Sequence, residues 1–267
     1  MNTNYFLSTG EIDRKRLTIT SKLYNPPALN FLKNCGLEPG MTVLEIGCGT
    51  GHMAVDLAKF LGSKGKVIAI DSSEDQIKVA RDTAKEYGVE NIEFHVCNVF
   101  DIDKLGISYD ATFGRWVIEF TQQPEKALEL MYEYLTPGGI LAYEATNMEQ
   151  TAFFSCPYHQ IIEQWHNNGA NIFRSHDYRL KFGYEVYDVF KQLHCKDIRL
   201  AFSQAILTTP EEKSVYRLGL TTIKAATLAK KFLTEKEIED MIKRFIAFEE
   251  SDAISGFYQN ILISGKK

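Results

Sequence analysis

The sequence predicts an α/β protein with a seven-stranded, mostly parallel sheet, helices on both faces of the sheet, and further helical insertions. Two observations support this fold class. From residue 40 to residue 145, short apolar segments alternate with amphipathic helical segments, which is the pattern of repeated β-α-β units. A glycine-rich turn, G-C-G-T-G at residues 47–51, directly follows the first apolar segment. After residue 146 the alternation stops and long helical stretches take its place.

Seven segments have the pattern of strands. They are short, either apolar or alternating in polarity, and bounded by turn residues. The expected strands cover residues 42–46, 66–70, 92–96, 109–113, 140–145, 198–202 and 257–264. Because helices separate the first five, we expect these strands to be parallel and covered on both faces. T-P-G-G, at residues 136–139, is expected to form the turn before the fifth strand.

Helices are expected between the strands, where apolar residues recur at three- and four-residue spacing. The first helix follows the glycine turn. The second begins at a capping-box pattern, Ser73 with Gln76, and the third begins at Pro124. Beyond the fifth strand, one helix is expected across residues 182–193 and two more within residues 211–250.

The segments around the sheet are longer than a compact sheet needs. The predicted division is an N-terminal helical cap at 1–37 and a main domain at 38–267, with lid insertions at about 146–180 and 207–252. In the cap, Asn25 precedes Pro26 and Pro27, the pattern of a helix N-cap with proline in the first turn. Thr234 with Glu237 forms a second capping box, inside the later insertion. The insertions are rich in aromatic residues, which suits an apolar pocket around a small ligand.

Composition excludes several classes of function. The 267 residues include 30 Lys and Arg against 35 Asp and Glu, a formal net charge of −5. This balance gives no electrostatic attraction to nucleic acid or to anionic membranes. The five cysteines, an odd number without framework spacing, indicate reduced thiols and a cytoplasmic protein. We expect no signal peptide, no membrane span, a small-molecule partner, and a monomer or homodimer.

The glycine turn discriminates among ligands. A dinucleotide-binding turn has the pattern G-x-G-x-x-G, but here the third glycine, Gly51, comes one residue early and His52 occupies the required position. A Walker-type phosphate loop is excluded because no Gly-Lys-Ser or Gly-Lys-Thr follows. Glu45 lies two residues before Gly47, where a carboxylate suits a cation better than a pyrophosphate. The expected ligand is therefore nucleoside-like, with positive charge near the turn and no phosphate.

Three motifs together carry a resemblance to a known family: E-x-G-x-G-x-G after the first strand, an acid ending the second, and P-G-G before the fifth. In these motifs, residues 38–145 resemble the class I S-adenosylmethionine-dependent methyltransferases, which have a Rossmann-like fold. Among them, the chain looks most similar to the small-molecule methyltransferases of ubiquinone and menaquinone biosynthesis. The resemblance implies S-adenosylmethionine as cofactor, S-adenosylhomocysteine as product, and methyl transfer to an O, N or C atom of a small molecule.

The resemblance also implies cofactor-binding residues. The glycine turn and Glu45 would face the methionyl part, and Asp71 would bind the ribose hydroxyls; the alternative for Asp71 is a helix-start residue. Family members usually carry Asp where this chain has Asn98, so Asn98 is expected beside the adenine, with Asp101 as the alternative. The complete expected set is Glu45, Gly47, Cys48, Gly49, Gly51, Asp71, Ser72, Gln76, Asn98, Val99, Arg115, Trp116 and, from a lid, Tyr5.

The residues near the methyl group are less determined by the pattern. Arg115 and Trp116 follow the fourth strand, which lines the sulfonium side in the family, although Trp116 also suits a core position. A general base is needed only if the acceptor atom starts protonated. The candidates for that role are His159, His166 and Glu119, and no catalytic residue is assigned.

The sequence also bears on functions other than small-molecule methyl transfer. A metal site is not expected, because Cys156 and the scattered histidines lack the paired spacing of zinc ligands. A non-catalytic S-adenosylmethionine-binding protein with a regulatory or assembly role stays open. An RNA or protein methyltransferase is disfavoured by the net negative charge and by the absence of N-P-P-Y after the fourth strand.

Overall fold

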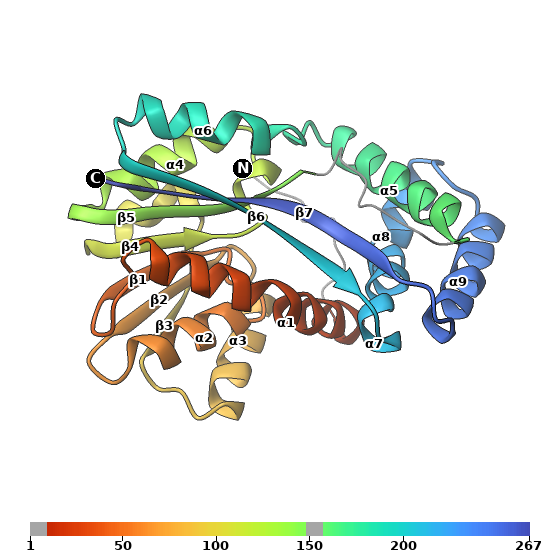
Figure 1. The fold of residues 1–267 in the computed structure, drawn as a ribbon, viewed down its shortest axis with the longest axis horizontal. Helices are drawn as coiled ribbons and strands as arrows, with labels where there is room; N and C mark the ends of the chain where they lie inside the picture. The colour runs from red at the N-terminus through yellow and green to blue at the C-terminus, as the bar shows by residue number, and fades with distance from the viewer. Residues whose placement is uncertain (1–9, 148–156) are drawn as a thin grey trace.

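The computed structural model describes residues 10–147 and 157–267. Its strands are β1 (Thr42–Ile46), β2 (Lys66–Asp71), β3 (Ile92–Val96), β4 (Tyr109–Gly114), β5 (Leu135–Thr146), β6 (Lys196–Leu207) and β7 (Ser255–Lys266). They form one sheet in the order β3-β2-β1-β4-β5-β7-β6. The first five strands are parallel, and β7 runs antiparallel to its neighbours β5 and β6. The predicted seven-stranded, mostly parallel α/β fold is confirmed (Figure 1).

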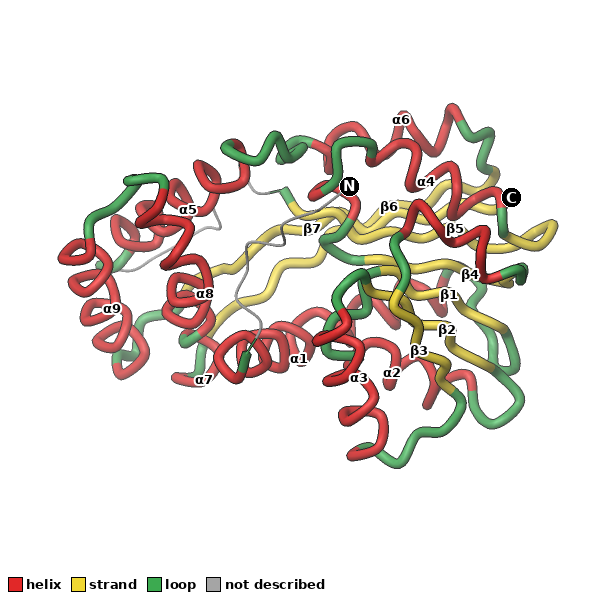
Figure 2. The backbone as a smooth tube through the Cα atoms, turned by 180° about the vertical axis from the view of Figure 1, so that it is seen from behind, coloured by secondary structure: helices red, strands yellow, loops and turns green. Residues whose placement is uncertain are grey.

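Helices account for most of the remaining described chain. They are α1 (Glu11–Asn34), α2 (His52–Leu61), α3 (Glu74–Glu86), α4 (Pro124–Glu133), α5 (His159–Arg174), α6 (Phe182–Gln192), α7 (Pro210–Lys213), α8 (Val215–Ala229) and α9 (Glu235–Glu250), with short 3-10 helices η1 (Val99–Leu105) and η2 (Ile118–Phe120). Figure 2 shows these helices on both sides of the strands.

Both faces of the central strands are buried. In β2, alternate side chains enter two different hydrophobic cores, one on each face of the sheet. Val67 and Ala69 point into a core shared with α1, α2 and α3. The alternate residues, Ile68 and Ile70, point into the core on the other face, which α4 and α6 cover. Because successive side chains of a strand alternate between faces, a strand covered on both sides is apolar over its buried part, as β2 is at its four central residues.

A third core lies beyond the sheet, at the end where β6 and β7 meet α5, α8 and α9 (Figure 1). Trp165 of α5, Tyr216 of α8 and Phe245 of α9 are buried together there. The predicted capping box is confirmed at the start of α9, where Thr234 and Glu237 each bond the other's backbone N–H. The described helices of the insertions pack together in this core, and two of them, α7 and α8, contact α1.

Three local predictions were wrong. Residues 136–139, predicted as a turn, lie inside β5, where the pairing with β4 shifts register. The strands β6 and β7 each extend over 12 residues, longer than predicted. At the start of α3, the Ser73 hydroxyl accepts from the Gln76 backbone N–H, but this cap lacks the reciprocal bond of a full box.

The fourth error concerns α1. Asn25 is not an N-cap, because it lies inside this helix, and so do Pro26 and Pro27. The prolines have no N–H to donate to the preceding turn of the helix. Asn25 is buried and its side chain bonds Asp56 and Arg115, so long-range contacts outweigh the local preference for a cap.

Candidate functional site

A cavity of about 310 Å³ opens at the carboxyl ends of β1, β2, β3 and β4. The glycine turn after β1 and the residues that end the other three strands line one side of it, while α1, α5, α8 and β7 line the other. The edge formed by the carboxyl ends of parallel strands is where open α/β sheets bind ligands. Segments predicted separately from the sequence thus meet at one place.

The three glycines of the turn have different surroundings, although all have positive φ angles of +61°, +52° and +79° in chain order. A Cβ on Gly47 would lie 2.1 Å from a methyl carbon of Val117, and a Cβ on Gly51 would lie 3.0 Å from the backbone of Ala80 in α3. A Cβ on Gly49 would meet only Leu17, at 4.0 Å. Gly47 and Gly49 line the cavity, whereas Gly51 is held by packing against α3 and is not part of the lining.

Asp71 connects the glycine turn to the start of α3. Its Oδ2 accepts a hydrogen bond from the Gly49 N–H at 3.0 Å, and its Oδ1 accepts one from the Ser73 N–H at 2.9 Å. Burial raises the pKa of the Asp71 carboxyl, and these backbone donors act in the opposite direction. Each carboxylate oxygen has a second lone pair, so Asp71 can orient the turn and still accept from a ligand hydroxyl. Ser72 and Gln76 line the cavity beside it.

Glu45 places a carboxylate on β1, below the turn. It is buried, and among the described residues its Oε2 has no hydrogen-bond partner. Burial raises the pKa of Glu45 to about 8; Arg115 opposes this shift, and Asp56 and Asp71 add to it. The side chain that accepts a hydrogen bond from the turn is Asp71, whose Oδ2 accepts from the Gly49 N–H.

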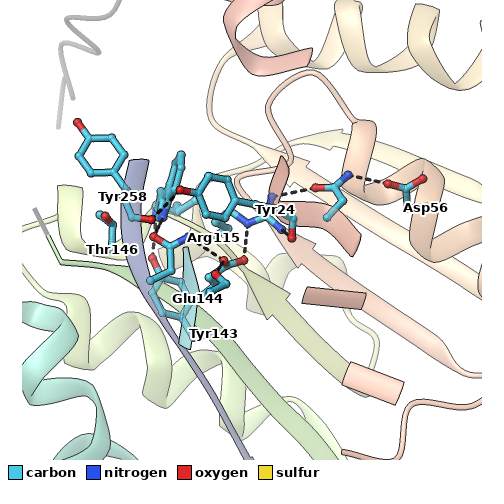
Figure 3. A network of polar contacts seen from close by, with 12 residues as sticks. Tyr24, Asp56, Arg115, Tyr143, Glu144, Thr146 and Tyr258 are labelled. Atoms are coloured by element: carbon cyan, nitrogen blue, oxygen red, sulfur yellow. Dashed lines mark hydrogen bonds and ion pairs between the residues drawn. The ribbon is translucent and has the colours of Figure 1, made fainter. Parts of the chain in front are cut away.

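Arg115 lies at the end of β4 and belongs to the network shown in Figure 3. Its Nε donates to Glu144 of β5, its Nη1 donates to Asn25 Oδ1 at 2.8 Å, and its Nη2 donates to the Tyr24 carbonyl at 3.2 Å. Both acceptors outside β5 belong to α1. Arg115 therefore joins the helix on one side of the cavity to the sheet on the other.

Trp116 and Cys48 also line the cavity. The Trp116 indole N–H donates to Asn260 of β7 at 3.0 Å, and its ring packs edge-on against Tyr24 and Tyr258, with centroids 5.2 and 5.7 Å apart. Trp116 thus lines the cavity, as a cofactor contact would, and also packs against neighbouring aromatic rings, as a core residue would.

Two residues after β3, Asn98 and Asp101, are candidates for the position beside the adenine, and their surroundings differ. Asn98 and Val99 line the cavity. The Asn98 side-chain carbonyl caps η1 by accepting from the Phe100 N–H at 3.0 Å. Asp101 forms an exposed ion pair with Lys104 at 2.7 Å and is not part of the lining. The geometry therefore favours Asn98 over Asp101 as the residue facing a ligand.

None of the three candidate bases lines the cavity. Glu119 is buried beside Tyr143, whose hydroxyl donates to it, and it also accepts from the Thr146 N–H at 3.2 Å. Burial raises the pKa of Glu119 to about 7. His166 is buried against the rings of Trp165 and Tyr258, and His159 is exposed at the start of α5. Their positions give no support to a role in catalysis.

The sequence did not identify much of the cavity wall. Residues from α1, α5, α8 and β7 complete the lining, together with His52 at the start of α2. The unpredicted residues of these helices and of β7 include Arg16, Leu17, Thr20, Ser21, Asn25, Gly169, Val215, Gly219, Thr222, Ile223, Phe257 and Tyr258. No local signal marks them, because which face of a helix meets the cavity depends on tertiary packing. Tyr5 lies outside the described residues.

Within residues 10–147 and 157–267, no three His, Cys, Asp or Glu side chains are arranged to hold a metal ion. Cys156 lies outside these ranges. Among the helices described, none combines the length and apolarity needed to cross a bilayer.

The order of the strands, the glycine turn and the cavity at the carboxyl edge define a Rossmann-like α/β protein with a ligand site at the end of β1. Residues 37–212 match the family model described as a methyltransferase domain. The chain belongs to this family, and the resemblance inferred from its motifs is confirmed.

Relatives and solved structures agree with this family. A demethylmenaquinone methyltransferase of Lactococcus lactis is 28% identical over 131 residues, which cover 49% of this chain and 52% of the relative. The chain thus spans about half the length of the curated relatives it matches. A structure titled as a SAM-dependent methyltransferase from Aquifex aeolicus has a TM-score of 0.51 at 19% identity, covering 94% of this chain and 99% of that one.

A phosphoethanolamine N-methyltransferase 2 of Haemonchus contortus, solved with phosphomonomethylethanolamine and S-adenosylhomocysteine, has a TM-score of 0.54 at 18% identity. The match covers 90% of this chain and 53% of that one. At such low identity the two structural likenesses establish the fold and leave the ligands open.

Proposed function

We propose that this protein is an S-adenosylmethionine-dependent methyltransferase that methylates an O, N or C atom of a small molecule. The observation that carries the proposal is the turn after β1. Gly49 opens onto the cavity, and the buried Glu45 carboxylate below the turn has an oxygen without a partner among the described residues. A ligand with a positive charge that needs close approach to the backbone fits both features. S-adenosylmethionine has a sulfonium and an ammonium group, and the family is the one expected for it.

Different residues around the turn would contact different parts of the cofactor. Glu45 would face the positive end, Gly49 would allow close backbone approach, and the free lone pairs of Asp71 would accept from the ribose hydroxyls. Asn98 and Val99 would lie beside the adenine. When bound, the cofactor supplies a methyl group activated by the sulfonium. The protein's task is then to align the acceptor atom with that methyl group and to exclude water.

The acceptor would occupy the part of the cavity lined by α5 and β7. Aromatic side chains dominate there: Phe120 and Phe173 stack with centroids 5.0 Å apart, and Trp165, Tyr178 and Tyr258 also line the cavity. Such a wall suits a small, largely apolar molecule. RNA would require a basic, open rim, and the chain has a net charge of −5. These features favour the small-molecule enzyme over an RNA or protein methyltransferase.

The test combines binding with turnover. We expect calorimetry to detect binding of S-adenosylmethionine and S-adenosylhomocysteine but not NAD. With methyl-labelled cofactor and cell extract, we expect label in the low-molecular-weight fraction. Tight NAD binding, or no binding of S-adenosylmethionine, would refute the proposal. Cofactor binding without transfer of label to any fraction would favour the non-catalytic rival.

We also propose that α1 and α5 form a lid over the bound cofactor, because both line the cavity. Hydrogen exchange with and without S-adenosylhomocysteine tests this: we expect protection in residues 11–30 and 157–180. Unchanged exchange there, with protection of the glycine turn, would show that these helices only pack as a second core.

A cytoplasmic location and a monomeric or homodimeric state are further proposals, to be checked by fractionation and by light scattering.

A further inference from the structure

Asn25 is a buried amide in the interior of α1. The residue is 3% exposed and is followed by two prolines within the helix. Asparagine has low helix propensity, and a buried amide needs hydrogen-bond partners. Both ends of this amide have them: Oδ1 accepts from Arg115 Nη1 at 2.8 Å, and Nδ2 donates to Asp56 Oδ2 at 2.7 Å. Arg115 directly follows β4, the strand beside β1, and Asp56 lies on α2, the helix that follows the glycine turn.

The guanidinium of Arg115 is held by acceptors on two elements (Figure 3). Glu144 of β5 provides one, while α1 provides the other two, the Asn25 side chain and the Tyr24 carbonyl. Glu144 is fully buried and accepts two more hydrogen bonds, from side chains of β6 and β7. The direction of the Arg115 side chain therefore depends on α1 as well as on its ion pair with Glu144.

Glu45 is a second buried carboxylate in the electrostatic range of Arg115. The charges that act on Glu45 are Arg115 from β4, Asp56 from α2 and Asp71 from β2. Between these described residues, the ion pair of Arg115 is made with Glu144 and not with Glu45. Glu45 is thereby left without a cation. A carboxylate already paired with an arginine would bind a positively charged ligand poorly, because that ion pair would have to break first.

We propose that Asn25 is a positioning residue for cofactor binding: it holds the Arg115 guanidinium on Glu144 and away from Glu45, which stays available to the positive end of the ligand. The inference rests on the proposed function and extends it to a residue that does not itself contact the methyl group. Without the Asn25 amide, a donor of the partly buried Arg115 is left without a protein partner, which is costly. Turning toward Glu45 satisfies that donor.

Asn25→Leu and Asn25→Asp separate the two contacts of the amide. Leucine removes both contacts but keeps a similar size and favours helix. Aspartate keeps an oxygen that accepts from Arg115, while its second oxygen faces the Asp56 carboxylate in place of the amide donor and adds a negative charge. Asn168→Leu is the matched control, because Asn168 is also 3% exposed, lies inside α5 and is not part of the cavity lining. Circular dichroism confirms that each variant is folded.

The readout is binding of S-adenosylhomocysteine at pH 7, measured by calorimetry in two buffers of different ionisation enthalpy, which gives the protons released. Glu45 in the wild type is mostly protonated at this pH, since its pKa is about 8. The ammonium group of bound S-adenosylhomocysteine should ionise Glu45 and release close to one proton. In Asn25→Leu, Arg115 has already ionised Glu45, so we expect about tenfold weaker binding with little proton release. Asn25→Asp and Asn168→Leu should keep the proton release.

Several results would overturn the inference. Weaker binding of Asn25→Leu with unchanged proton release would show that Asn25 only stabilises α1. Wild-type affinity in Asn25→Leu would show that it has no role, and loss of proton release in Asn25→Asp would move the role to the contact with Asp56. Wild-type binding without proton release would also overturn it while leaving the proposed function intact. No binding of S-adenosylhomocysteine to the wild type would overturn both.

Discussion

Replacing single glycines of the turn by alanine should separate packing from ligand binding. In Gly51→Ala the new Cβ lies 2.9 Å from the Cβ of Ala80 and 3.0 Å from its Cα, at a φ of +79°. The left-handed backbone costs about 1–2 kcal/mol for a residue with a side chain, and crowding in a packed core costs about 1–3 kcal/mol. We therefore expect the free energy of unfolding to fall by about 2–5 kcal/mol.

Gly49→Ala should behave differently. Its Cβ has only a methyl carbon of Leu17 at 4.0 Å, so the loss of stability should be limited to the backbone term of about 1–2 kcal/mol. The same Cβ projects into the space a ligand would occupy, and binding of S-adenosylhomocysteine should weaken at least about tenfold. The control is Gly88→Ala, where φ is +64° and no atom lies within 4 Å of the new Cβ.

Urea unfolding followed by circular dichroism gives the stabilities, and calorimetry gives the affinities. Gly49→Ala and Gly88→Ala should match in stability and differ in binding. If Gly49→Ala loses as much stability as Gly51→Ala, the division of the turn into packing and ligand-facing glycines is incorrect. Wild-type affinity in Gly49→Ala would show that the ligand does not approach this part of the turn.

Three further predictions use single substitutions. Asp71→Ala should weaken binding of S-adenosylhomocysteine by about 1–3 kcal/mol, because ligand hydroxyls and the Gly49 N–H lose their acceptor; an unchanged dissociation constant in calorimetry would disprove this role. Because the pKa of Glu45 is raised to about 8 and a positive ligand prefers the ionised form, wild-type affinity should rise from pH 6 to pH 8 by up to about tenfold per pH unit. Glu45→Gln should remove that slope, and parallel pH profiles of variant and wild type would contradict the assignment. Thr234→Ala removes the cap of α9 and should lower the free energy of unfolding by about 0.5–2 kcal/mol in urea, with cofactor affinity unchanged because α9 lies outside the cavity lining.

Local patterns were sufficient where neighbouring residues determine the structure. The four central residues of β2, at positions 67–70, are all apolar. Each face of the strand meets a different core, so burial on both sides could be inferred from the sequence alone. The glycine turn could also be predicted, because positive φ angles at alternate positions require glycine. Asp71 was found by its place at the end of β2, and it does lie against the turn.

The remaining features depend on contacts between residues far apart in the chain. Asn25 has the local pattern of an N-cap, but its partner Arg115 lies 90 residues away in the sequence. Glu119 lies near the end of β4 in the sequence, yet its carboxylate does not face the cavity. It accepts hydrogen bonds from the Tyr143 hydroxyl and the Thr146 N–H. No periodicity of α1 or α8 indicates which face completes the cavity wall. Such facts require the positions of other elements, which a local pattern does not contain.

The place of β7 in the sheet affects how the protein is made. This strand lies between β5 and β6, although the ribosome synthesises it after both. Glu144 of β5 accepts a hydrogen bond from the side chain of Asn260, which lies on β7, 116 residues further along the chain. The Trp116 indole N–H donates to the side chain of Asn260. A nascent chain that ends before residue 255 has the glycine turn but lacks the strand that joins β6 to the other five strands. The edge of β5 then stays open to other chains during translation, and a long-range step of this kind is slow.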